Sequence, residues 1–101
     1  MLFKKKKSLK RKIAKELDGK YIKVITERKN ESEETVGKTG AFIIKGEEIL
    51  VYSEEKVVFR SLIDDTDFSP LLSLGGVIIH GNDIEHSGME RTLVIYYTYH
   101  I

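Results

Sequence analysis

The sequence contains no cysteine, no tryptophan and a single proline among its 101 residues. Without cysteine, disulfide frameworks and thiolate metal sites are excluded, and the composition suits a reducing compartment. One proline and an apolar content of 41% argue against extended disorder. A chain of this length has room for one small domain. We therefore predict a single folded domain, and we expect a cytoplasmic location.

Long hydrophobic runs are also missing. Apolar runs such as Val77 to Ile79 and Leu93 to Tyr97 are short, whereas a membrane helix needs about 20 apolar residues. A secretory signal would follow its basic start with an uninterrupted apolar segment, but lysine and arginine recur up to Glu16. The sequence therefore predicts neither a membrane-spanning helix nor an export signal.

The charges that are present divide sharply along the chain. Residues 1–17 hold eight lysines and arginines and one acid, Glu16, which gives this segment a net charge of +7. The remaining residues hold nine basic and 15 acidic side chains, a net charge of −6. The overall charge of +1 therefore conceals a basic segment joined to an acidic body. Such a segment favours a polyanionic partner, such as nucleic acid or an anionic membrane surface.

Apolar residues within the basic segment recur at helical spacing. Leu9, Ile13 and Leu17 are four residues apart, which predicts a helix from an N-cap at Ser8 to Leu17. Before this helix, the four lysines at positions 4–7 repel one another. We therefore expect residues 1–7 to form a flexible basic arm and residues 8–101 to form one small β-barrel domain with an N-terminal helix.

Beyond residue 19 the periodicity becomes extended, because β-branched and aromatic residues alternate with turn residues. The predicted strands are Tyr21–Thr26, Thr39–Lys45, Glu48–Ser53, Lys56–Arg60, Gly76–His80 and Arg91–Tyr99. We predict a turn at residues 81–83, an irregular loop at 64–70 and one helical turn at 70–74. The predicted fold is mainly β with an N-terminal α-helix, a small, strongly bent antiparallel sheet or barrel of five to six strands.

Both faces of these strands carry apolar residues. In the last strand Leu93 and Ile95 share one face, while Val94 and Tyr96 lie on the other. A sheet with one wet face alternates more cleanly, so we expect cover on both sides from barrel closure, the helix or a second copy of the chain. The sequence therefore predicts a homo-oligomer.

Two segments resemble the motifs of Sm-like proteins. The first is Leu17 to Val24, which follows a short helix, and the second is Leu74 to Ile84, an apolar strand with His80-Gly81-Asn82-Asp83 near its end. The resemblance implies a five-stranded barrel, a ring and RNA binding, with His80 and Asn82 as contacts. His80 replaces the family's base-stacking arginine, and an imidazole can stack on a base without supplying a guanidinium's charge.

The candidate nucleic-acid-binding residues lie mainly on the basic segment. They are Lys4, Lys5, Lys6, Lys7, Lys10, Arg11, Lys12 and Lys15, to which the resemblance adds His80 and Asn82. Phosphate contacts from these cations would make affinity fall steeply with salt. Three alternatives stay open: a solvated tail, weak anchoring of Leu2 and Phe3 at an anionic membrane, and an arm held by the acidic body. The acidic residues considered for this last role are Glu31, Glu33, Glu34, Asp64, Asp65 and Asp67.

Metal-binding and catalytic patterns are weak. His80 and His86 flank two acids, but no third histidine or cysteine is near enough to complete a zinc site. The acidic run Asp64–Asp67 lacks the glycine and the final glutamate of an EF-hand calcium loop. Neither a nucleophile elbow nor a phosphate-binding glycine loop is present. We therefore expect no metal, no cofactor, no small-molecule substrate and no enzymatic activity.

The sequence thus predicts a non-enzymatic, self-associating small-barrel interaction module that binds RNA or another polyanion through its basic N-terminal arm. The alternative is a structural or regulatory protein–protein interaction module with no nucleic-acid role. Tyr96, Tyr97 and Tyr99 fit either function, because tyrosines on a sheet can stack bases or can fill a core or a subunit interface.

Overall fold

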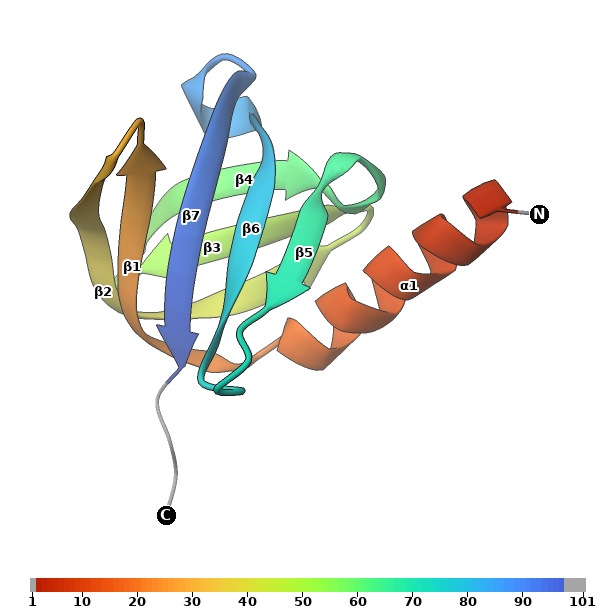
Figure 1. Ribbon diagram of the computed structural model, residues 1–101, viewed down its shortest axis with the longest axis horizontal. Coiled ribbons are helices and arrows are strands. Elements are labelled where there is room, and N and C mark those ends of the chain that lie inside the picture. The colour runs from red at the N-terminus through yellow and green to blue at the C-terminus, as the bar shows by residue number, and fades with distance from the viewer. Residues whose placement is uncertain (1, 98–101) are drawn as a thin grey trace.

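The computed structural model describes the chain from residue 2 to residue 97, and its side chains from residue 8 onward (Figure 1). The helix α1 (Leu2–Leu17) precedes a series of strands. These are β1 (Tyr21–Lys29), β2 (Ser32–Lys45), β3 (Glu48–Ser53), β4 (Lys56–Leu62), β5 (Asp67–Pro70), β6 (Gly76–Asp83) and β7 (Met89–Tyr97). Two short 3-10 helices, η1 (Ile63–Asp65) and η2 (Ile84–His86), follow β4 and β6.

The strands form one antiparallel sheet of seven in the order β4-β3-β2-β1-β7-β6-β5, which curls into a half-barrel (Figure 1). β1 lies at its centre, where Tyr21 is opposite Ala41 of β2 and Ile22 is opposite Tyr97 of β7. The predicted class, mainly β with an N-terminal helix and a bent antiparallel sheet, is confirmed. The predicted number of five to six strands is wrong.

The seventh strand is β5, which lies in the segment predicted as an irregular loop. It pairs only with β6, where Phe68 is opposite Ile79, and it ends at Pro70. Proline is tolerated there because an edge strand needs no amide donor on its open side. The helical turn predicted for residues 70–74 does not form, since β5 occupies its start and the segment after Pro70 is a loop.

The turn predicted at residues 81–83 is also wrong, because β6 continues to Asp83, opposite Met89 of β7. The reversal comes later, after η2. There Ser87 and Gly88 have φ angles of 58° and 75°, in the left-handed region, and glycine adopts that region at little cost. β6 therefore ends at Asp83, which is buried.

Helix α1 begins at Leu2, six residues before the predicted N-cap at Ser8, which lies inside the helix. Lysine is a good helix former, and this propensity favours continuation of the helix through residues 4–7. The helix ends at Leu17, and Gly19, with φ of 81°, turns the chain into β1. The Asp18 carboxylate accepts a hydrogen bond from the Ile44 amide at 2.9 Å and fixes this junction.

The core lies between the concave face of the sheet and the C-terminal half of α1. Its buried residues are Ala14, Leu17, Ile22, Ile25, Phe42, Ile49, Val51, Phe59, Ile63, Val77, Ile79, Leu93 and Ile95. The sheet bends sharply where β2 meets β3, and a Cβ atom on Gly40 would lie 1.6 Å from the Tyr52 carbonyl oxygen. Only glycine fits this close approach.

Tyr97 belongs to the core rather than to an open stacking surface. Its ring meets Phe42 edge-to-face, with centroids 6.3 Å apart, and the Lys20 ammonium lies 4.3 Å from its centroid. Burial raises the pKa of Tyr97 to about 12. Tyr99, the third tyrosine considered above, lies outside the described residues.

Side chains close the gap between β4 and the β6–β7 hairpin. The fully buried carboxylate of Asp83 accepts a hydrogen bond from the backbone amide of Arg60 on β4 at 3.1 Å. Arg91 on β7 donates to the carbonyl oxygen of Val58, which also lies on β4, at 2.8 Å. At this point of the half-barrel, β4 is therefore joined to the hairpin by hydrogen bonds from charged side chains.

Candidate nucleic-acid interface

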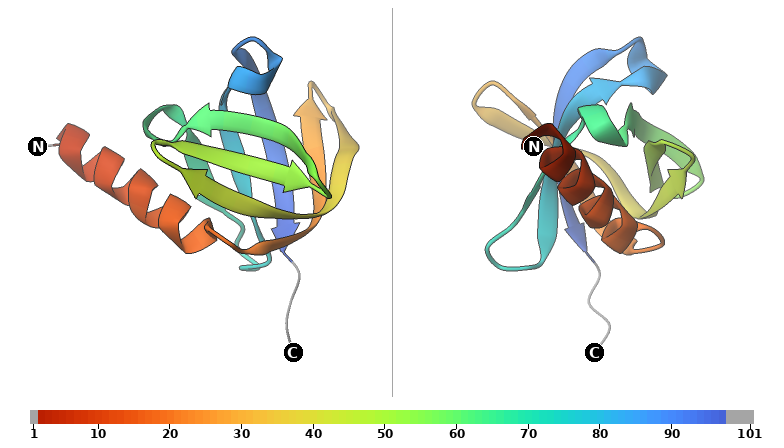
Figure 2. Two further views of the ribbon diagram at one scale, coloured as in Figure 1. Left: turned by 180° about the vertical axis from the view of Figure 1, so that it is seen from behind. Right: turned by 90° about the vertical axis from the view of Figure 1, so that its right-hand side faces the viewer.

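Helix α1 carries all of the candidate basic residues of the N-terminal segment. Because the helix starts at Leu2, the lysines at positions 4–7 belong to the same helix as Lys10, Arg11, Lys12 and Lys15. Figures 1 and 2 show the helix running away from the sheet toward its N-terminus, so that its first turns project from the body. The side chains of Lys4, Lys5, Lys6 and Lys7 lie outside the described part of the chain.

Two of the candidate cations contact the acidic body. Arg11 donates from Nε and Nη2 to the two carboxylate oxygens of Asp64, at 3.0 and 2.8 Å. Lys10 lies 3.3 Å from the Asp67 carboxylate and donates to the Asp64 carbonyl oxygen at 3.2 Å. Hydrogen bonding to Asp64, followed by the charge of the same carboxylate, raises the pKa of the Arg11 guanidinium. The structure thus places two of the proposed acidic residues against α1.

Lys12 and Lys15 have a different environment. Both side chains are exposed, and no hydrogen bond or ion pair of theirs is found among the side chains that the structure describes. A phosphate group can therefore approach either ammonium without displacing a protein carboxylate. Among the basic residues of α1 whose side chains are described, these two are the ones without a carboxylate partner.

The acidic loop that receives Lys10 and Arg11 is firmly held. Ile63 is buried beneath it, and the Ile63 amide donates to the Glu47 carbonyl oxygen at 2.9 Å. The buried hydroxyl of Thr66 donates to the Leu62 carbonyl oxygen at 2.6 Å and also lies 2.6 Å from the Ser61 hydroxyl. Asp64 is consequently presented to the helix by a fixed loop rather than by a free tail.

His80 and Asn82, the two candidates supplied by the Sm-like resemblance, lie on β6 among polar and acidic side chains. His80 Nδ1 is 2.6 Å from the Thr92 hydroxyl, and Nε2 is 2.6 Å from the Glu90 carboxylate. Asn82 is exposed opposite Glu90. Asp67, the partner of Lys10, pairs with His80 across the β5–β6 ladder. His80 thus lies in the strand next to the one that carries the carboxylate partner of Lys10.

The sequence interpretation missed a buried cluster formed by Glu27, Asp83 and Arg91. Arg91 donates from Nε and Nη2 to the two Glu27 oxygens, at 3.0 and 2.8 Å, and from Nη1 to Asp83 at 2.6 Å. The Arg91 side chain is only 9% exposed. Asp83 also accepts from the Glu85 amide at 3.0 Å and lies 2.6 Å from His86 Nδ1.

This buried cluster had a detectable signal in the sequence. Glu27 stands two residues after Ile25, and Arg91 two residues before Leu93, so both charges occupy core-facing positions of their strands. Buried charges need partners of opposite sign. The hydrogen bonds from Arg91 hold the pKa of Glu27 below its usual range, against the effect of burial. Through Arg91 the cluster joins β7 to β1, β4 and β6.

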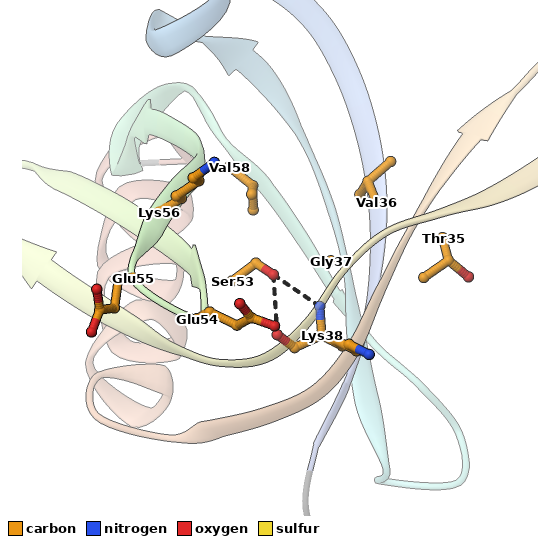
Figure 3. Close-up of a pocket in the computed structure, with 9 residues that line it drawn as sticks. All are labelled: Thr35, Val36, Gly37, Lys38, Ser53, Glu54, Glu55, Lys56 and Val58. Carbon is orange, nitrogen blue, oxygen red and sulfur yellow. Dashed lines mark hydrogen bonds between the residues drawn. The ribbon is translucent and has the colours of Figure 1, made fainter.

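The surface also has depressions between neighbouring strands. One depression, of about 720 Å³, lies between β2 and the β3–β4 turn and is lined by both charge signs, with Lys38 on β2 and Glu54, Glu55 and Lys56 at the turn (Figure 3). Its one internal hydrogen-bond pair joins the Ser53 hydroxyl to the Lys38 backbone. No group of three acidic or histidine side chains placed to hold a metal ion is found among the described residues.

Two leucines on the β5–β6 loop are strongly exposed. Leu72 and Leu74 expose 102% and 77% of their reference areas, and Leu74 has a φ of 61°, in the left-handed region. A leucine gains nothing for stability from such a position, because both its apolar area and its backbone are unfavourably placed. The loop is therefore a second surface of interest, separate from the basic helix.

Comparison with known proteins gives no relative: the chain matches no protein-family model, no curated protein and no solved structure. Among the described residues, no helix combines the length and the hydrophobicity needed to cross a bilayer.

Proposed function

We propose that this chain is a non-enzymatic interaction module that binds RNA or another polyanion through helix α1. The observation that carries the proposal is that one projecting helix bears eight basic residues and a single acid. Phosphate contacts from lysine and arginine supply most of the affinity in sequence-independent nucleic-acid binding. The acidic body supports the same assignment, since it repels a polyanion and directs it toward the helix.

The proposal assigns the main contacts to the exposed lysines. Lys12 and Lys15 lack protein partners among the described side chains and stand one turn apart on α1. The lysines at positions 4–7 would extend this surface along the same helix. His80 and Asn82 contribute less, because Glu90 lies beside both and disfavours an approaching phosphate.

A salt titration with matched variants tests this function. We expect a fluorescein-labelled 20-nucleotide polyuridine to bind the full chain with an affinity that falls as salt rises. Each phosphate contact contributes about 0.7 to the logarithmic salt slope for a single strand. The double variant Lys12→Gln/Lys15→Gln should lower that slope by about 1.4. The control Lys23→Gln/Lys45→Gln removes the same charge from exposed positions on β1 and β2 and should leave the slope close to the parent value.

The same titration can refute the proposal. Equal slopes for the two double variants would show that α1 is not the binding surface. Absence of binding at low salt, under which such electrostatic contacts are strongest, would reject the polyanion function itself.

Self-association belongs to the proposal as well. Tyr21 and Ile43 expose apolar area on the outer face of the sheet, in a groove of about 590 Å³ whose rim includes Glu54 and Glu55. A second copy would cover such a face, in line with the two-sided apolar pattern of the strands. Light scattering during size-exclusion chromatography decides the point, since a monomer mass at micromolar concentration would reject it.

A protein partner is the second candidate, and the exposed leucines at positions 72 and 74 favour it. On that hypothesis the loop binds another protein and α1 serves docking or solubility. The variant Leu72→Ser/Leu74→Ser should then abolish recovery of one stoichiometric protein from a pull-down, while a polyanion-binding module would keep its salt-dependent affinity in this variant.

A further inference from the structure

The Asp64 carboxylate accepts hydrogen bonds from Arg11 of α1 in the way that a phosphate group would. A guanidinium presents two parallel N–H groups, and carboxylates and phosphates accept from this fork with similar geometry. Both oxygens of Asp64 are engaged by Arg11, at 3.0 and 2.8 Å. Any phosphate that binds Arg11 through the same two donors must displace this carboxylate.

The ion pairs are not what holds the helix to the body. Ala14 and Leu17 are buried in the core, and the Gly19 amide donates to the Phe42 carbonyl oxygen at 2.8 Å just beyond the helix. Arg11 is 60% exposed, and exposed ion pairs contribute about 0–1 kcal/mol to stability. The contact therefore matters little for anchoring α1, whereas it changes the charge that α1 offers to a ligand.

Asp67 further reduces the positive charge that α1 offers to a ligand. Its carboxylate lies 3.3 Å from the Lys10 ammonium, which also donates to the Asp64 carbonyl oxygen at 3.2 Å. Together the two acids face two of the four basic side chains that the structure describes on α1. Because η1 is fixed by Ile63 and Thr66, the carboxylates remain close to the helix when no ligand is bound.

We propose that Asp64, supported by Asp67, is an affinity-determining residue that competes with the polyanion for Arg11 and Lys10. This inference rests on the proposed function of α1 and adds a built-in counter-ion to it. Polyanion binding engages Lys12 and Lys15 first and gains Arg11 only when local phosphate density is high enough to displace Asp64. The loop thus favours densely charged partners over isolated phosphates.

Asp64→Asn and Asp65→Asn form a matched pair of variants for the test. Asp65 is exposed in the same 3-10 helix and makes no ion pair with α1 among the described side chains. Both substitutions remove one negative charge, but only Asp64→Asn releases Arg11. With the labelled polyuridine described above, Asp64→Asn should raise affinity about two- to fivefold, the scale of one exposed charge contact. It should also steepen the salt slope by about 0.7, and Asp65→Asn should leave the slope unchanged.

Arg11→Gln completes a thermodynamic cycle. In the parent chain this substitution should change affinity little, because Arg11 is already paired with Asp64. In the Asp64→Asn background it should abolish the gain in affinity and slope. Thermal melts of all variants by circular dichroism verify that each one is folded.

The outcomes separate this inference from the function on which it rests. If the parent chain binds with a salt slope that depends on Lys12 and Lys15, but Asp64→Asn and Asp65→Asn behave alike, the competition by Asp64 is refuted and the function stands. If no variant binds the polyuridine at low salt, both the function and the inference are refuted. A gain specific to Asp64→Asn that requires Arg11 is the result we expect.

Discussion

Two of the arginine–carboxylate clusters in this molecule, those of Arg91 and Arg11, differ mainly in exposure. Arg91 binds Glu27 and Asp83 inside the half-barrel, where the three side chains are 9% exposed or less. Arg11 binds Asp64 at the surface, with Asp67 beside it on Lys10, and the Arg11 side chain is 60% exposed. Similar hydrogen-bond distances thus occur in two very different solvent environments.

Exposure decides what each cluster can do. In the buried cluster, removal of any partner leaves a desolvated charge behind, so these contacts hold the strands together and are not exchanged for outside ligands. In the exposed cluster water and salt screen the attraction, so a partner can be exchanged for an external anion at little cost. The comparison teaches that ion-pair geometry alone does not separate a structural contact from a binding surface.

The largest expected effect comes from Arg91→Leu. It removes the guanidinium that Glu27 and Asp83 share in the interior, and breaking a buried network in this way costs about 3–5 kcal/mol. Urea unfolding followed by far-ultraviolet circular dichroism gives the change in the free energy of unfolding. The matched variant Arg11→Leu should lose about 1 kcal/mol or less. Similar losses for the two variants would remove the distinction between the clusters.

A smaller effect is expected for Glu27→Gln, about 1.5–3 kcal/mol at neutral pH, because a hydrogen bond to a charged group is weakened. The pH dependence is more specific. Arg91 keeps the pKa of folded Glu27 below the usual value of 4.5, so this carboxylate stabilises the protein above that pH. Its contribution is lost as the pH falls through the folded pKa. Urea curves at a series of acidic pH values should show this loss in the parent chain and a weaker one in Glu27→Gln.

The smallest effect is expected for Asp64→Asn on stability. Its ion pair is exposed, so the free energy of unfolding should fall by about 0–1 kcal/mol, and the difference should shrink at high salt. Unfolding curves at low and high sodium chloride concentrations measure both quantities. A loss above about 2 kcal/mol that salt does not reduce would assign Asp64 to the structural class of contact.

The sequence was sufficient to predict the strands whose apolar residues are dense. Glu48–Ser53 was predicted with its observed bounds, and the strands around Val77 and Leu93 were placed correctly within a few residues. β5 could not be found in this way, because its only apolar side chain that joins the core is Phe68 and its order depends on the ladder to β6. The early start of α1 was missed because charge repulsion among the lysines was weighed above their helix propensity.

The candidate site was predictable in composition but not in pairing. The excess of basic residues at the N-terminus identified α1, and Asp64 and Asp67 were among the acids considered as its partners. Which two cations these acids would meet depends on how η1 packs against the helix, a tertiary contact between residues more than 50 positions apart. The Glu27–Asp83–Arg91 cluster was missed although its members occupy core-facing positions, because their mutual contact depends on how β1, β6 and β7 pack in the folded sheet.

The pairing of β1 with β7 also sets the order of events during synthesis. Ile22 of β1 meets Tyr97 of β7, so this ladder of the sheet cannot form until both segments have left the ribosome. Helix α1 emerges before Ile63 and Asp64, which follow about 50 residues later, and at roughly 5–20 residues per second this is a delay of several seconds. For that interval Arg11 and Lys10 are without the acidic loop that pairs with them in the folded protein, so the basic segment carries its full positive charge.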